Sequence, residues 1–276
     1  MESDFSTVVL IIGFVRSRNL SRILDTCLSS SDLPVIVSLD GPRNERDVLL
    51  INESCQKVLS FNEPNRILLR QCPKNFGLSK HIVGAIDFAM SEYDSVIVLE
   101  DDCIPAVSFI DFCISGLKTF KNQNEIIYLS GTNLDVDFSL KAEENCLKTQ
   151  YGQIWGWATW KDRWVARETR VNYYYVIFSR LPLLEKIFWI RNFRKPLWDS
   201  VWGFYNLLRQ NGYSIMPKDN LVSNVGFDNQ STNYGEDSSR NLEYSLSKAK
   251  IDVLKCADYN SEFDRKLFDL RYRQLS

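Results

Sequence analysis

The most informative stretch of this 276-residue chain is SVIVLEDD, residues 95–102. Residues 96–99 are aliphatic, which is typical of a short strand buried on both faces of a parallel sheet. Glu100, Asp101 and Asp102 follow at once, and adjacent carboxylates repel one another where a buried strand ends. A divalent cation would remove that repulsion, since Mg²⁺ and Mn²⁺ prefer carboxylate and diphosphate oxygens. The alternative is a solvated turn in which Asp102 caps the helix that follows.

Short apolar runs alternate with amphipathic stretches through the first half of the chain. Strands are predicted at 7–14, 34–39, 66–70, 95–99 and 126–130, and helices at 19–30, 46–61, 78–91 and 107–120. This alternation predicts an α/β fold, in which a mostly parallel, Rossmann-like sheet is flanked by helices on both sides. Ligands of such sheets bind at the carboxyl ends of the strands, so candidate site residues are sought there.

The second half of the chain has a different character, because it is rich in Trp and Tyr and has fewer predicted strands. Helices are predicted at 183–191 and 200–211, and the polar segment 223–240 has the composition of a mobile loop. We therefore divide the chain into an α/β region, 1–150, and a smaller region, 151–276. Since no long linker separates them, we expect one compact unit.

Composition excludes several classes of protein. Lys and Arg total 33 and Asp and Glu 35, so the net charge of −2 argues against a nucleic-acid partner held by bulk charge. Hydrophobic residues make up 45%, which excludes a disordered chain. The seven cysteines form no C-x-x-C motif, which argues against a cysteine zinc site and fits reduced thiols in a cytosol. The apolar run at 8–15 is too short to span a bilayer, so we expect a cytoplasmic protein.

Polar residues follow the other predicted strands too. Arg16 comes after the first strand and could form a fork to a phosphate or a base carbonyl. Asp40 comes after the second and suits a nucleobase imide or a ribose, although Asp-Gly-Pro is also good turn chemistry. Gly77 precedes a helix whose N-terminus could approach a diphosphate. His81 lies in that helix, and a lone histidine is more often structural than functional.

These motifs resemble, in order, those of GT-A nucleotide-sugar transferases, and of the N-acetylglucosaminyltransferase I type (glycosyltransferase family 13) in particular. The resemblance covers about residues 8–120 and rests on GFVRSRNLSRILDTC, VSLDG, NFGLSKHIVGAIDFAM and VIVLEDDCIPAVSFIDF. The family carries an equivalent EDD motif after a similar strand, and the second half of the chain matches more loosely. The resemblance implies the GT-A form of the α/β fold, with a smaller acceptor-side region at the C-terminal end.

The resemblance also implies roles for residues in the first half. Asp102 would ligate Mn²⁺ or Mg²⁺ directly. Glu100 and Asp101 would lie near the ribose, the donor sugar and the water shell of the metal. Arg16 and Asp40 would hold the uridine of a UDP-sugar donor.

His81 matches a histidine that the family places near the donor, and the catalytic base is sought in the second half. An inverting transfer needs one base near the acceptor hydroxyl, and without a second histidine the base should be Asp or Glu. Asp199, in LWDSVW, is the candidate, with helix capping as the alternative. The family has a W-D-D-W segment whose first Asp is similar to a catalytic base; here Ser200 replaces the second Asp.

Three further segments of the second half carry predictions. IWGWATW, residues 154–160, offers aromatic faces for a sugar ring, and we assign Trp157 to the donor site and Trp160 to the core. Residues 224–235 resemble the family's loop that orders over the nucleotide-sugar. The basic, aromatic stretch 180–195 suits a peripheral contact with an anionic membrane, or else a core helix with a charged outer face.

We therefore expect a metal-dependent, inverting glycosyltransferase that moves a sugar from a nucleotide-sugar, such as UDP-GlcNAc, to a glycan or lipid-linked acceptor in polysaccharide or glycoconjugate synthesis. One alternative is a sugar-phosphate nucleotidyltransferase. That class needs a Gly-rich, basic loop after the first strand, and GFVRSRNLSR, residues 13–22, has one Gly. The other is a catalytically inactive GT-A binding module.

Overall fold

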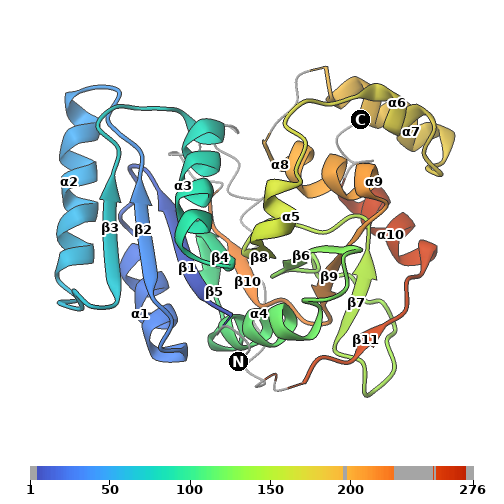
Figure 1. The fold of residues 1–276 in the computed structure, drawn as a ribbon, viewed down its shortest axis with the longest axis horizontal. Coiled ribbons are helices and arrows are strands. Elements are labelled where there is room, and N and C mark those ends of the chain that lie inside the picture. The colour runs from blue at the N-terminus through green and yellow to red at the C-terminus, as the bar shows by residue number, and fades with distance from the viewer. Residues whose placement is uncertain (1–4, 195–197, 227–250, 252, 272–276) are drawn as a thin grey trace.

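A nine-stranded sheet forms the centre of the computed structural model, which describes residues 5–194, 198–226, 251 and 253–271 (Figure 1). From one edge to the other, the strands are β3 (Ile67–Gln71), β2 (Val35–Leu39), β1 (Thr7–Gly13), β4 (Ser95–Glu100), β8 (Trp157–Trp160), β6 (Ile126–Ser130), β9 (Tyr213–Pro217), β7 (Cys146–Thr149) and β11 (Cys256–Ala257). A separate pair joins β5 (Cys103–Pro105) to β10 (Val222–Asn224). The expected α/β fold, with a mostly parallel sheet flanked by helices, is confirmed.

The helices lie between and after these strands. They are α1 (Leu20–Ser30), α2 (Glu45–Leu59), α3 (Leu78–Glu92), α4 (Val107–Thr119), α5 (Lys161–Val165), α6 (Tyr173–Ile177), α7 (Leu183–Asn192), α8 (Trp198–Ser200), α9 (Asn206–Gln210) and α10 (Ser261–Arg271). A π-helical turn, Val201–Tyr205, joins α8 to α9, so the single helix predicted at 200–211 is interrupted. None of the described helices is long and apolar enough to cross a bilayer.

Alternation along β1 explains how helices cover both faces of the sheet. Val9 and Ile11 pack with residues of α1 and α4, whereas Val8 and Leu10 pack with residues of α3 on the other face. Successive strand side chains point to opposite faces, so a strand buried on both sides must be apolar throughout. This is why the run at 7–14 shows no polar alternation.

The strand order reverses beside β1, which is the feature that positions the site. β1 pairs in parallel with β2 on one side and with β4 on the other. The connections that leave β1 and β4 therefore run to opposite sides, and ligands of open α/β sheets bind at the carboxyl ends of strands where this occurs. Arg16 follows β1, Glu100 ends β4, and Asp101 and Asp102 come directly after it.

The far half of the sheet is mixed, and the sequence pattern did not predict this. β8 runs antiparallel to both of its neighbours, β4 and β6. β7 runs antiparallel to β9. Strands from both sides of residue 150 therefore alternate in one sheet, with β8 inserted between β4 and β6.

A buried carboxyl of the second half makes a pH-dependent stability prediction. Asp264 accepts hydrogen bonds from the Thr149 hydroxyl and the Gln150 amide, and burial raises its pKa from 3.8 to about 6. The folded state therefore keeps a proton that the unfolded chain has released, so stability falls as pH rises between about 4 and 6. Asp264→Asn should remove about 3 kcal/mol of that decline, measured by urea unfolding across this range. Equal pH slopes in the variant and the parent protein would contradict this account.

Candidate active site at the strand ends

The carboxyl ends of β1 and β4 and the start of β8 meet at one place. Because β8 is antiparallel to β4, Trp157 pairs with Val98, and the preceding Trp155 and Gly156 lie beside the end of β4. Gly156 has a φ of +64°, and a Cβ there would lie 2.6 Å from Val222, so the turn into β8 packs directly on β10. The site therefore combines the switch point of the sheet with a turn from the second half of the chain.

Asp102 is paired with Arg16 across the switch point. Arg16 Nη1 lies 2.7 Å from Asp102 Oδ2, with both side chains mostly buried. Arg16 Nη2 also donates to the Gly226 carbonyl at 3.3 Å. Both residues were predicted to lie at strand ends, and the structure brings their charged groups into contact.

The segment after β10 lies directly over Asp102. The Val225 amide donates to the Asp102 carbonyl at 2.9 Å. A Cβ at Gly226 would clash with Asp102 Oδ2, so a larger residue would displace the carboxylate or the chain. Val225 and Gly226 were not singled out among the candidate site residues. The predicted loop 224–235 begins here, and its residues 227–235 lie outside the described part of the chain.

Glu100 lies in a strongly negative environment. Burial raises its pKa well above the usual range, and the charges of Asp102, Asp101 and Asp199 raise it further, while Arg16 lowers it. Asp101 accepts a hydrogen bond from the Phe14 amide at 3.0 Å, which ties it to the end of β1. The strand end thus gathers more negative charge than Arg16 alone offsets.

Asp199 comes from α8, and its charge acts on Glu100 although the two residues lie far apart in the sequence. Its carboxylate accepts a hydrogen bond from the Ser200 amide at 2.7 Å. The adjacent Trp198 fixes the position of α8, since its ring is parallel to that of Trp202 and packs on Trp157. The predicted base therefore shares the negative cluster, and its role as base stays a prediction.

Asp40 was expected to contact uridine, but its carboxylate binds groups of the protein itself. Its Oδ1 accepts hydrogen bonds from the amides of Gly41 and Phe76, both at 2.9 Å. Its Oδ2 accepts from the Asn75 side chain and the Gly77 amide, both at 3.0 Å. The residue is 3% exposed, and two partners on each oxygen leave little capacity for a nucleobase. Asp40 thus holds the loop that precedes α3.

Replacing Asp40 tests this structural role. Asp40→Ala should lower the free energy of unfolding by about 3 kcal/mol, because it removes a buried carboxylate that accepts four hydrogen bonds from residues 41 and 75–77. Urea unfolding measures the loss. Asp32→Ala, at an exposed position, is the control. A loss below about 0.5 kcal/mol would show that the loop does not depend on this carboxylate.

His81 is also enclosed by protein groups. Its Nε2 lies 3.0 Å from the Ser38 hydroxyl, which also accepts a hydrogen bond from Arg70 at 3.2 Å. Burial lowers the pKa of His81, an effect that Asp40 opposes and Arg70 reinforces. The imidazole is therefore held neutral inside the domain. This matches the structural alternative given for a lone histidine, and its place near a donor stays a prediction.

Trp157 is not available to a sugar ring, and its assignment to the donor site was wrong. The side chain is 1% exposed and packs against Trp202, Tyr128 and Trp164 in the core. Trp160 is buried too, as expected. The half-buried aromatic residue of this segment is Trp155, which precedes β8. Trp155 differs from Trp157 and Trp160 because it precedes β8 and they lie in it, and the composition of the segment does not show this difference.

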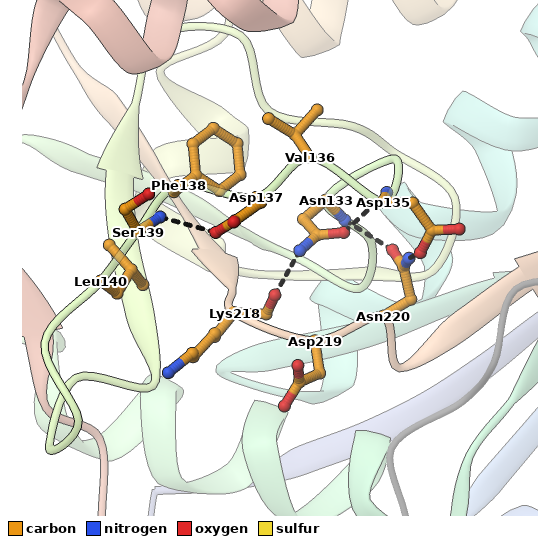
Figure 2. Close-up of a pocket in the computed structure, with 10 residues that line it drawn as sticks. All are labelled: Asn133, Asp135, Val136, Asp137, Phe138, Ser139, Leu140, Lys218, Asp219 and Asn220. Atoms are coloured by element: carbon orange, nitrogen blue, oxygen red, sulfur yellow. Dashed lines mark hydrogen bonds between the residues drawn. The ribbon is translucent and has the colours of Figure 1, made fainter.

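A polar cavity of about 270 Å³ lies nearby, where β6 and β9 end (Figure 2). The Asn220 side chain accepts from the Asn133 amide at 2.8 Å and donates to Asp135, and Figure 2 shows these three groups turned toward one another. No sequence motif indicated this cavity. Leu221, the residue after Asn220, leads into β10, so the chain passes directly from the cavity to the strand beside Asp102.

The donor set at the strand ends suits a hard cation that also binds a ligand. Within the described residues, no group of three or more His, Cys, Asp or Glu side chains is arranged to hold a metal ion. Mg²⁺ and Mn²⁺ at phosphate sites commonly take one or two carboxylates and complete their shell with phosphate and water oxygens. Excess negative charge around Glu100 and Asp102 fits such a cation.

Comparison with known proteins gives no family for this chain and only weak similarity to solved structures. No family model matches the chain, and no curated protein matches it. Among solved structures, A197 from STIV is 12% identical, with a TM-score of 0.39 over 79% of this chain and 84% of that one. A Bacillus anthracis protein assigned as a glucose-1-phosphate thymidylyltransferase, solved with sucrose, is 13% identical, with a TM-score of 0.28. That match covers 52% of this chain and 54% of the Bacillus protein, so about half of each is compared. The sheet, with its reversed strand order and flanking helices, makes this chain a Rossmann-like α/β protein.

Proposed function

We propose that this chain is a metal-dependent GT-A glycosyltransferase, which moves a sugar from a UDP-sugar or related donor to an acceptor hydroxyl with inversion. The observation that carries the proposal is the cluster at the switch point. Asp102, which follows β4, pairs with Arg16, which follows β1, and Glu100 at the end of β4 lies near the charges of Asp101, Asp102 and Asp199. A strongly perturbed carboxyl in such a cluster is typical of a catalytic or ligand site.

Opposite charges at this position suit a nucleoside diphosphate. Arg16 presents a planar fork that can bind two phosphate oxygens at once. Asp102 would hold Mn²⁺ or Mg²⁺, which supplies positive charge for the departing diphosphate when bound. In the structure these two residues satisfy each other, so donor binding would exchange one internal ion pair for contacts with the diphosphate and its cation.

We propose Asp199 as the group that accepts the proton of the acceptor hydroxyl. It lies in the second half of the chain, whereas the donor contacts come from the first, so the sugar would pass between them. Proton removal by a positioned carboxylate raises the nucleophilicity of the hydroxyl as it attacks the anomeric carbon. The acceptor is proposed to be a glycan or a lipid-linked saccharide, which the polar cavity beside Asn133 and Asn220 could contact.

Release of nucleoside diphosphate tests the proposal. The protein is incubated with UDP-GlcNAc and other UDP-sugars, with Mn²⁺ or with EDTA, and UDP is measured without and with saccharide acceptors. We expect slow, Mn²⁺-dependent release that acceptors accelerate. Pyrophosphate release from a nucleoside triphosphate and a sugar 1-phosphate would instead establish the nucleotidyltransferase alternative. Absence of both reactions across the panel would favour an inactive binding module.

A further inference from the structure

Helices α6 and α7 lie at one corner of the molecule (Figure 1), and several of their apolar side chains are exposed. Phe178 is 79% exposed, Leu183 72%, and Leu184 and Tyr174 both 68%. Ile187 on α7 is exposed as well, and the rings of Tyr174 and Phe178 stack on the outside of the corner. We call these five residues the α6–α7 surface. Large apolar side chains that cluster on a surface mark a site of contact with a partner or a membrane.

Helix α7 exposes apolar side chains on its outer face, where an ordinary surface helix is polar. Its inner face buries Glu185 and Trp189, while Leu183, Leu184 and Ile187 point outward. The inner face is firmly anchored, since the Trp189 ring stacks on Phe204 at 3.7 Å and Glu185 accepts a hydrogen bond from the Tyr151 hydroxyl. The outward leucines are therefore set by packing beneath them. This excludes a core helix with only a charged outer face, the alternative considered for 180–195.

The segment that carries α6 and α7 is rich in basic residues. The one acidic residue between residues 170 and 194, Glu185, is buried. Five basic residues occur in the same range: Arg170, Arg180, Lys186, Arg191 and Arg194. In the part of the chain that the structure describes, none of the five forms a salt bridge. This concentration stands out because the whole chain carries a net charge of −2.

We propose that the α6–α7 surface binds the face of an anionic lipid bilayer. Exposed Leu, Ile and Phe would enter the boundary between headgroups and acyl chains, Tyr would lie at headgroup level, and the arginines would pair with anionic headgroups. A second copy of the chain fits less well, because a two-fold interface would place this basic surface against itself. The inference concerns binding alone and does not rest on the proposed sugar transfer.

Vesicle flotation tests the inference with the whole protein. Phosphatidylcholine vesicles are compared with vesicles that contain about 30 mol % phosphatidylglycerol, at about 0.1 M and about 0.5 M salt. We expect binding to the anionic vesicles only, weakened at high salt. The double variant Arg180→Gln/Arg191→Gln should lower the partition coefficient about 25-fold, since each basic residue contributes a factor of about five. Leu183→Ser/Leu184→Ser should lower it at least about tenfold.

A matched control comes from α2, which also exposes an apolar and a basic side chain. Arg46→Gln/Leu49→Ser changes the same residue types away from the α6–α7 surface and should leave vesicle binding unchanged. Binding that this control weakens as much as the surface variants would overturn the inference, as would no binding to anionic vesicles. Sedimentation velocity provides the third arm: a dimer that Leu183→Ser/Leu184→Ser dissociates would assign the surface to a second copy and overturn the lipid proposal.

Discussion

Asp102→Asn is expected to reduce metal-dependent release of UDP from a UDP-sugar by about a thousandfold or more. The substitution keeps the shape of the side chain but removes the charge that would hold a cation against the diphosphate. A thousandfold loss corresponds to about 4 kcal/mol of transition-state stabilisation, within the range that such electrostatic contacts supply. Initial rates of UDP release at saturating donor and Mn²⁺ measure the effect.

A control must show that the loss does not come from unfolding. Asp102→Asn should unfold at nearly the parent temperature, because the introduced amide oxygen can still accept a hydrogen bond from Arg16 at the partly buried pair. Asp32→Asn, at an exposed position just after α1, should leave the rate within about twofold. A rate for Asp102→Asn within about tenfold of the parent protein would show that Asp102 does not hold the cation.

Asp199→Asn is expected to lower the transfer rate by about 10²–10⁴-fold while leaving donor binding intact. The amide cannot accept a proton from the acceptor hydroxyl, but it can still accept a hydrogen bond from the Ser200 amide, so α8 should keep its position. A base is distinguished from a positioning residue by a loss in kcat without a loss in donor affinity. Single-turnover transfer measures the first, and calorimetric titration with UDP and Mn²⁺ measures the second.

The control for Asp199 is an exposed aspartate from the same half of the chain. Asp258→Asn should change neither the rate nor UDP binding. Equal losses of transfer and UDP affinity in Asp199→Asn would make Asp199 a positioning residue for the negative cluster around Glu100. A transfer rate like that of the parent protein would require a different base.

Five strands of the first half, β1, β2, β3, β4 and β6, could be predicted because each carries its own apolar signal, whereas the short strands β5 and β7 were missed. The run at 126–130 is apolar and short, and β6 has those bounds. The place of β8 could not be predicted, since pairing with β4 and β6 depends on contacts between distant segments. Trp157 could not be separated from Trp155 either, because residues two apart in an extended chain share a face, and only the start of β8 at Trp157 puts one in the core and leaves the other outside the strand.

The candidate site was predictable in location but not in every role. The rule that ligands bind at the carboxyl ends of strands located Arg16 and Asp102, and the two residues form an ion pair. It could not reveal that Asp40 holds residues 75–77, because both motifs suit a ligand and only their contact shows that one binds the other. The segment 224–235 was expected near the donor from the resemblance, but the close packing of Gly226 on Asp102 could not be predicted, since a glycine in a polar segment gives no indication of what it contacts.

Thermal unfolding with a panel of nucleotides, each with and without Mn²⁺, tests most directly whether the switch-point cluster is a nucleotide-sugar site. A ligand that binds only the folded state raises the unfolding midpoint, by several degrees when its concentration far exceeds Kd. We predict that UDP or a UDP-sugar raises the unfolding midpoint only when Mn²⁺ is present, and that this rise disappears in Asp102→Ala. No rise with any nucleotide at millimolar ligand and metal would contradict it and would leave the EDD motif a structural turn.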